Sequence, residues 1–163
     1  METQSTPSYS AYSPVYGLRF MLPKGWTLEE NIGFGGIQIF TPDEEIGHHN
    51  PENISVLVRP QDNLNDINPT VLGYITNELI KSNYQSFKNY LLLNLQQREV
   101  DQLPAREMLF AYKDSNKDVN MGGLQIVFVK RNKLYLVTYS APDVRYGRFL
   151  EMVNNVIENM VIE

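Results

Sequence analysis

The stretch that decides the fold is Tyr16-Gly-Leu-Arg-Phe-Met-Leu-Pro-Lys-Gly-Trp26. Within it, Leu18, Phe20 and Leu22 are apolar at every second position, which is the period of a strand with one buried face. A proline and a glycine then end the strand, just before the only tryptophan of the chain. The stretch therefore predicts the first strand of a sheet, and it contains no obvious catalytic group.

Six further segments have the alternation or the β-branched composition of strands and lie between turn residues. They are residues 37–41, 53–59, 88–99, 106–113, 124–129 and 134–140. The segment 88–99 also contains a run of leucines with good helix propensity, but its alternation of polar and apolar residues favours a strand. The last two segments are joined by Lys130-Arg-Asn-Lys133, which predicts a hairpin with a charged tip.

Two helices are expected between and after these strands. The first has Asn68 as its N-cap and Pro69 as its first residue, and it extends to about Lys81. The second begins near Pro142 and carries an apolar stripe at three- and four-residue spacing, formed by Tyr146, Phe149, Leu150, Val153, Ile157 and Met160. The order βββ-α-ββββ-α predicts an α+β domain, in which helices pack on a central twisted antiparallel sheet of about six to seven strands.

The composition limits the domain organisation and the class of partner. Residues 1–14 are rich in Ser, Thr, Tyr and Pro, without hydrophobic periodicity, which is typical of a flexible arm; residues 15–163 are then a single domain. The chain has 163 residues, no cysteine and a net charge of −5. We therefore expect no disulfide, no thiolate metal site, no nucleic-acid partner, no transmembrane segment and a monomer.

Several parts of the sequence resemble the PsbP-like family of the PsbP/DcrB/Mog fold group. They are Tyr16 to Trp26, the strand pair 37–41 and 54–60, Gln102-Leu-Pro-Ala105 before a strand, and Gly123 to Ala141 with the helix that follows. The resemblance covers about residues 15–163. It implies an α/β/α sandwich that binds a protein partner without catalysis and is located outside the cytoplasm, in the thylakoid lumen or the cell envelope.

The resemblance also implies a more specific role. The member that gives the family its name is an extrinsic, membrane-associated subunit on the lumenal side of photosystem II, where it supports calcium and chloride retention at the oxygen-evolving centre. By this resemblance the chain is an extrinsic subunit or accessory factor of a membrane complex, with photosystem II and calcium ion binding as its sharpest version.

The loop between residues 43 and 52 contains the best candidates for a metal site. Asp43, Glu45, His48 and His49 combine carboxylate and imidazole donors, which suit zinc or manganese. Adjacent histidines in an extended loop point to opposite sides, so a solvated loop is the simpler interpretation. The same residues could serve a metal-dependent or general acid/base enzyme, which would still need a nucleophile and an oriented partner.

Other motifs have simpler structural interpretations. Asp114-Ser-Asn-Lys-Asp118 begins like a calcium loop, but Val119 and Gln125 stand where that loop needs glycine and glutamate, so a polar loop between strands is expected. Gly33-Phe-Gly-Gly36 leads into a strand instead of a helix, which predicts a turn and not a phosphate site. Trp26 is expected to cap the core. Tyr9, Tyr12 and Tyr16 offer an alternative partner surface.

Three functions remain open from the residues alone. A complete core without a convergent nucleophile, base and oxyanion donors favours a binding or assembly protein. The rivals are an enzyme that uses the loop Asp43 to His49 and a carrier of a small apolar ligand held between sheet and helix.

Overall fold

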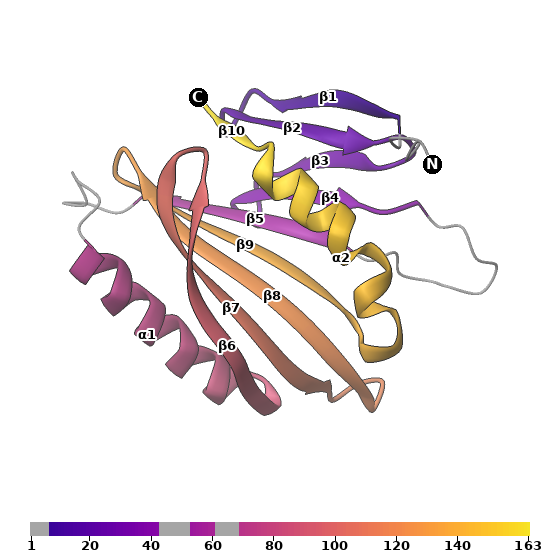
Figure 1. Ribbon diagram of the computed structural model, residues 1–163, viewed down its shortest axis with the longest axis vertical. Helices are drawn as coiled ribbons and strands as arrows, with labels where there is room; N and C mark the ends of the chain where they lie inside the picture. The colour runs from indigo at the N-terminus through magenta and orange to yellow at the C-terminus, as the bar shows by residue number, and fades with distance from the viewer. Residues whose placement is uncertain (1–6, 43–52, 61–68) are drawn as a thin grey trace, which may run out of the picture.

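The computed structural model describes residues 7–42, 53–60 and 69–163. In this part of the chain the main sheet has seven antiparallel strands in the order β3-β4-β5-β9-β8-β7-β6 (Figure 1). Their bounds are β3 (Thr27–Asn31), β4 (Gly36–Phe40), β5 (Asn53–Pro60), β6 (Lys88–Val100), β7 (Leu103–Asp114), β8 (Val119–Lys130) and β9 (Lys133–Pro142). A smaller sheet has the order β1-β2-β10, with β1 (Ser8–Ser13), β2 (Leu18–Pro23) and β10 (Val161–Ile162).

The two helices pack on opposite faces of the main sheet. Alternation along β9 explains how one strand serves both, because Tyr135 and Val137 pack in the larger core with α2 (Asp143–Glu158). Leu134 and Leu136 point the other way and pack with α1 (Pro69–Ser86). The result is the expected α/β/α arrangement around an antiparallel sheet, and the predicted α+β class is confirmed.

The smaller sheet packs on the same face of the main sheet as α2, beside the helix. Leu18, Phe20 and Leu22 are fully buried and belong to the same core as α2 and the inner residues of β4 and β5. Figure 1 shows β1, β2 and β10 lying over β3 and β4, beside α2. The stretch Tyr16 to Trp26 therefore forms a strand as predicted, but this strand belongs to the smaller sheet.

The flexible arm predicted for residues 1–14 differs from the structure from residue 8 onward. Residues 8–13 form β1, which pairs with β2 from Ser8↔Pro23 to Ser13↔Leu18. Its sequence, Ser-Tyr-Ser-Ala-Tyr-Ser, fully buries only Ser13, so the strand depends on this pairing and on a hydrogen bond from the Tyr9 hydroxyl to the carbonyl of Trp26. Residues 1–6 lie outside the described residues.

Most of the other predicted strands and helices are present in the structure, but they begin or end at different residues. The six further predicted strands correspond to β4 to β9, and the second helix is α2. The helix α1 ends at Ser86 and not near Lys81, and β7 already begins at Leu103. The strands β3 and β10 were not predicted, because β3 is mostly exposed and polar and β10 has only two residues. No helix in the described ranges is both long and apolar enough to cross a membrane.

Candidate functional site

A buried polar network lies between α2 and the outer strands of the main sheet. The Nη1 atom of Arg98 on β6 lies 3.3 Å from the Oε2 atom of Glu107 on β7 and 2.9 Å from the Oδ1 atom of Asn154 on α2. The Nε2 atom of Gln96 donates to the same Glu107 oxygen at 3.1 Å. Glu107 is only 8% exposed. Because its carboxylate is already engaged by two donors, this network holds β6, β7 and α2 together and offers no free base.

Tyr146 on α2 lies beside this network, and its buried hydroxyl has no hydrogen-bond partner among the described residues. Burial, and then the nearby charge of Glu107, raise the pKa of Tyr146 to about 12. The ring is held in place, since it stacks on Tyr139 at 5.4 Å between centroids and a Cβ atom on Gly122 would approach it to 2.8 Å. A neutral phenol with so high a pKa is neither a nucleophile nor a base near neutral pH.

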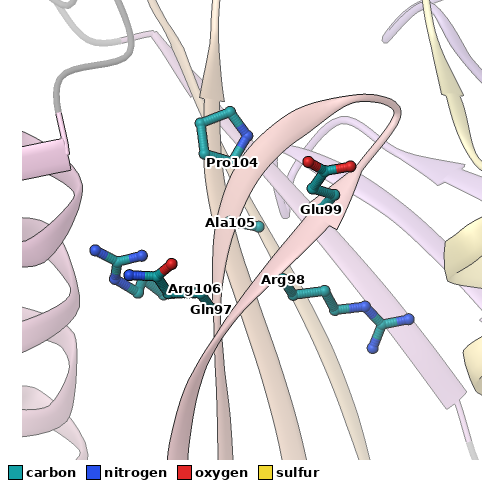
Figure 2. Close-up of a pocket in the computed structure, with 6 residues that line it drawn as sticks. All are labelled: Gln97, Arg98, Glu99, Pro104, Ala105 and Arg106. Atoms are coloured by element: carbon teal, nitrogen blue, oxygen red, sulfur yellow. The ribbon is translucent and has the colours of Figure 1, made fainter.

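A surface pocket of about 250 Å³ lies at the end of the β6–β7 hairpin. Figure 2 shows its lining residues, with the side chains of Gln97 and Arg106 together on one side of the hairpin and the guanidinium of Arg98 on the other. The remaining lining residues are Glu99, Pro104 and Ala105. The charged groups point away from one another, so the pocket lacks the converging set that a reaction requires.

The predicted metal candidates Asp43, Glu45, His48 and His49 lie outside the described residues, and the site stays a prediction. Elsewhere, across residues 7–42, 53–60 and 69–163, no three or more histidine and carboxylate side chains come together as a metal group.

The other motifs behave as their structural interpretations predicted. The Oδ1 atom of Asp114 accepts the backbone N–H groups of Asn116 at 2.9 Å and Lys117 at 3.2 Å, so its loop is a polar turn between β7 and β8. Gly35, with φ of +84°, lies in the turn between β3 and β4. Trp26 is 3% exposed and meets Phe149 of α2 edge to face, with 6.1 Å between centroids, which confirms that it belongs to the core.

The strand β6 carries three exposed leucines, Leu91, Leu93 and Leu95, which we call the leucine edge; Leu91 pairs with Ala111 and Leu95 with Met108, so these two lie on opposite faces of the sheet. Among the described strands β6 pairs only with β7, so its other side is an open edge of the sheet. The pairing shifts between Leu92 and Asn94, which leaves Leu93 unpaired in a bulge and 61% exposed. The sequence showed the alternation of these leucines, but not that they lie on the outermost strand.

The comparisons with known proteins all point to one fold. A model of the PsbP family matches residues 7–161. Cyanobacterial PsbP from Synechocystis is 17% identical, with a TM-score of 0.66 over 100% of this chain and 96% of that one. LpqN of Mycobacterium tuberculosis, which is involved in cell envelope biogenesis, is 14% identical, with a TM-score of 0.70 over 95% of this chain and 90% of that one.

A further solved structure has a similar fold. A protein from Bacteroides thetaiotaomicron is 12% identical, with a TM-score of 0.63 over 98% of this chain and 49% of that one. No match was found among curated proteins. At these identities the similar structures establish the fold, while the family match rests on the sequence itself.

Proposed function

Because this chain belongs to the PsbP family, we propose that it is a non-catalytic binding protein, an extrinsic subunit or accessory factor of a membrane complex. The chemistry of the described residues supports this proposal. The Glu107 carboxylate is engaged by Arg98 and Gln96, and Tyr146 has a pKa far above neutral. Neither group is suited to act as a general acid, a general base or a nucleophile.

The observation that carries the proposal is the leucine edge. Its three leucines are all at least 44% exposed, and they lie on a strand whose outer backbone groups have no described strand beside them. An open edge of this kind pairs with an extended segment of another protein, whose main chain continues the sheet. Covering the exposed part of each leucine would contribute about 1 kcal/mol, in addition to the backbone hydrogen bonds.

The more specific version of the proposal places the protein outside the cytoplasm and at photosystem II. Similarity to cyanobacterial PsbP supports it, but LpqN has a similar TM-score and is involved in cell envelope biogenesis. The fold therefore supports a photosystem partner and an envelope partner about equally. A chain encoded by a non-photosynthetic organism would exclude the photosystem version and leave the binding proposal in place.

Site-directed photocrosslinking tests the binding proposal. A photoreactive amino acid would replace Leu93 in one preparation and Val144 in another; Val144 is 93% exposed on α2 and serves as the matched control. Each protein is incubated with detergent-solubilised membranes of the source organism and irradiated. We expect one defined crosslinked protein from position 93 and none from position 144, and substitution of Leu91 by aspartate should abolish it. Equal crosslinking from both positions, or none from position 93, would contradict the proposal.

A further inference from the structure

One end of the main sheet brings together two tight turns that are far apart in the sequence. The turn between β3 and β4 is tied to β5, because the backbone N–H of Val58 donates to the carbonyl of Gly35 at 2.9 Å. The β8–β9 hairpin tip reaches the same end, since Pro60 of β5 pairs with Lys133 of β9. Three strand spacings separate the two turns, which corresponds to about 14 Å.

The first of these turns presents apolar side chains to solvent. Ile32 is 77% exposed and Phe34 is 39% exposed. The turn is nevertheless well held, because Asn31 accepts the backbone N–H of Phe34 on its side chain at 3.0 Å and that of Gly35 on its carbonyl at 3.0 Å. These two side chains therefore extend from a fixed turn and contribute little to the core.

Cationic side chains lie on β5 and at the β8–β9 tip, at the same end of the sheet as this turn. Arg59 at the end of β5, and Arg131 and Lys133 at the β8–β9 tip, are exposed and make no ion pair within the described part of the chain. The acidic Asp101 at this end is already occupied, since it accepts the N–H of Ile162 at 3.0 Å and lies 3.9 Å from the Nζ atom of Lys130. Glu29 and Glu30 are exposed on β3, so the cationic part of this end is the strip formed by Arg59, Arg131 and Lys133, in a chain whose net charge is −5.

We propose that this end docks on an anionic lipid surface. Its residues, which we call the tip surface, are Ile32, Phe34, Arg59, Arg131 and Lys133. Two apolar side chains on a protruding turn can enter the headgroup region of a bilayer, while nearby cations meet lipid phosphates. Specific binding to an acidic protein would need a complementary interface of about 1,000 Å² or more. Binding to a lipid surface needs only the insertion of apolar side chains and the attraction between opposite charges. The leucine edge lies on β6, at the far side of the sheet, and remains free for a protein partner.

Sedimentation with lipid vesicles tests this inference without a protein partner. The full chain is mixed with vesicles of phosphatidylcholine alone, or of phosphatidylcholine with phosphatidylglycerol. We expect binding to the anionic vesicles only, and release by salt. Neutralising both Arg131→Gln and Lys133→Gln should weaken binding about 25-fold, because each cation near such a surface contributes a factor of about five. Ile32→Ser combined with Phe34→Ser should also release the protein.

Matched controls separate the tip surface from the rest of the molecule. The double change Lys24→Gln and Lys81→Gln removes the same charge from exposed positions on other parts of the chain, and it should leave binding within about twofold of the parent. Failure of the parent to bind anionic vesicles would overturn the inference, as would equal binding to neutral vesicles or equal loss in the control. None of these outcomes bears on crosslinking at position 93, which concerns a protein in detergent.

Discussion

Replacing Tyr146 by phenylalanine should stabilise the protein, although tyrosine-to-phenylalanine changes in a folded interior often do the opposite. The Tyr146 hydroxyl is buried without a hydrogen-bond partner among the described residues, so folding removes its water and these residues supply no hydrogen bond in return. An unsatisfied buried polar group costs about 1–3 kcal/mol. The ring itself, stacked on Tyr139, stays in place in the variant. We therefore expect the free energy of unfolding at pH 7 to rise by about 1 kcal/mol.

The same substitution should change how stability depends on alkaline pH. The pKa of Tyr146 is raised from 10.0 to about 12, so the unfolded chain releases the phenol proton at a lower pH than the folded protein does. The parent protein then loses stability as the pH rises from about 10 towards 12. The phenylalanine variant lacks this loss. After allowance for solvent screening of a half-buried group, the advantage of the variant should grow by about 1 kcal/mol across this window.

Tyr112→Phe is the matched control for this prediction. The Tyr112 hydroxyl lies 2.6 Å from the Oγ atom of Ser140, so its removal leaves a partner unsatisfied and should lower stability by about 1 kcal/mol. Urea unfolding at pH 7 and at steps up to pH 11 measures both variants against the parent. The reasoning would be refuted if Tyr146→Phe were as destabilising as the control, or if its advantage did not grow above pH 10.

Three further predictions concern single positions. Gly36→Ala should destabilise the protein by about 3 kcal/mol in urea unfolding, because the new Cβ would lie 1.9 Å from the carbonyl oxygen of Val56. Gly73→Ala on α1 is the opposite case: its Cβ meets nothing within 4 Å, so the free energy of unfolding should rise by about 0.5–1 kcal/mol. Glu107→Ala removes the carboxylate nearest the buried Arg98 guanidinium, which keeps Asn154 at 2.9 Å and Glu158 at 4.0 Å, and should cost about 3 kcal/mol; a thermal unfolding midpoint unchanged from the parent would contradict this. If the metal prediction is correct, protein purified without a tag holds near-unit zinc or manganese by elemental analysis, and His48→Ala or His49→Ala removes it.

Much of the fold could be predicted because the residues concerned carry their own periodicity. The alternation in Leu18 to Leu22 and in the later strands follows from one-sided burial, and the stripe on α2 follows from packing one face of a helix. These signals are local, so they can be recognised without knowing which strands and helices pack against one another. The strand β1 lacked such a signal, because its serines and tyrosines have no apolar alternation and become a strand only through pairing with β2.

The polar network could not be predicted for a different reason. Arg98 and Glu107 meet because the β6–β7 pairing places Gln96 opposite Glu107, and that register is set by the two-residue turn between Val100 and Leu103. A shift of one residue would send each side chain to the other face of the sheet. Asn154 then joins from a helix far along the chain. Register and helix docking are tertiary facts, and no spacing in the sequence encodes them directly.

The two proposed surfaces depend on strand order more than on strand identity. The leucines of β6 alternate in the sequence like an ordinary buried face, but the bulge at Leu93 places Leu91 and Leu95 on opposite faces, and they are exposed because β6 ends the series β3-β4-β5-β9-β8-β7-β6. The same series places β5 beside β9, which brings the turn at Ile32 to the end where Arg131 lies. Had β5 paired elsewhere, the apolar turn and the basic tip would have separated. Function in this fold is therefore expected where the order of strands leaves an edge or gathers turns, and sequence patterns alone do not reveal either place.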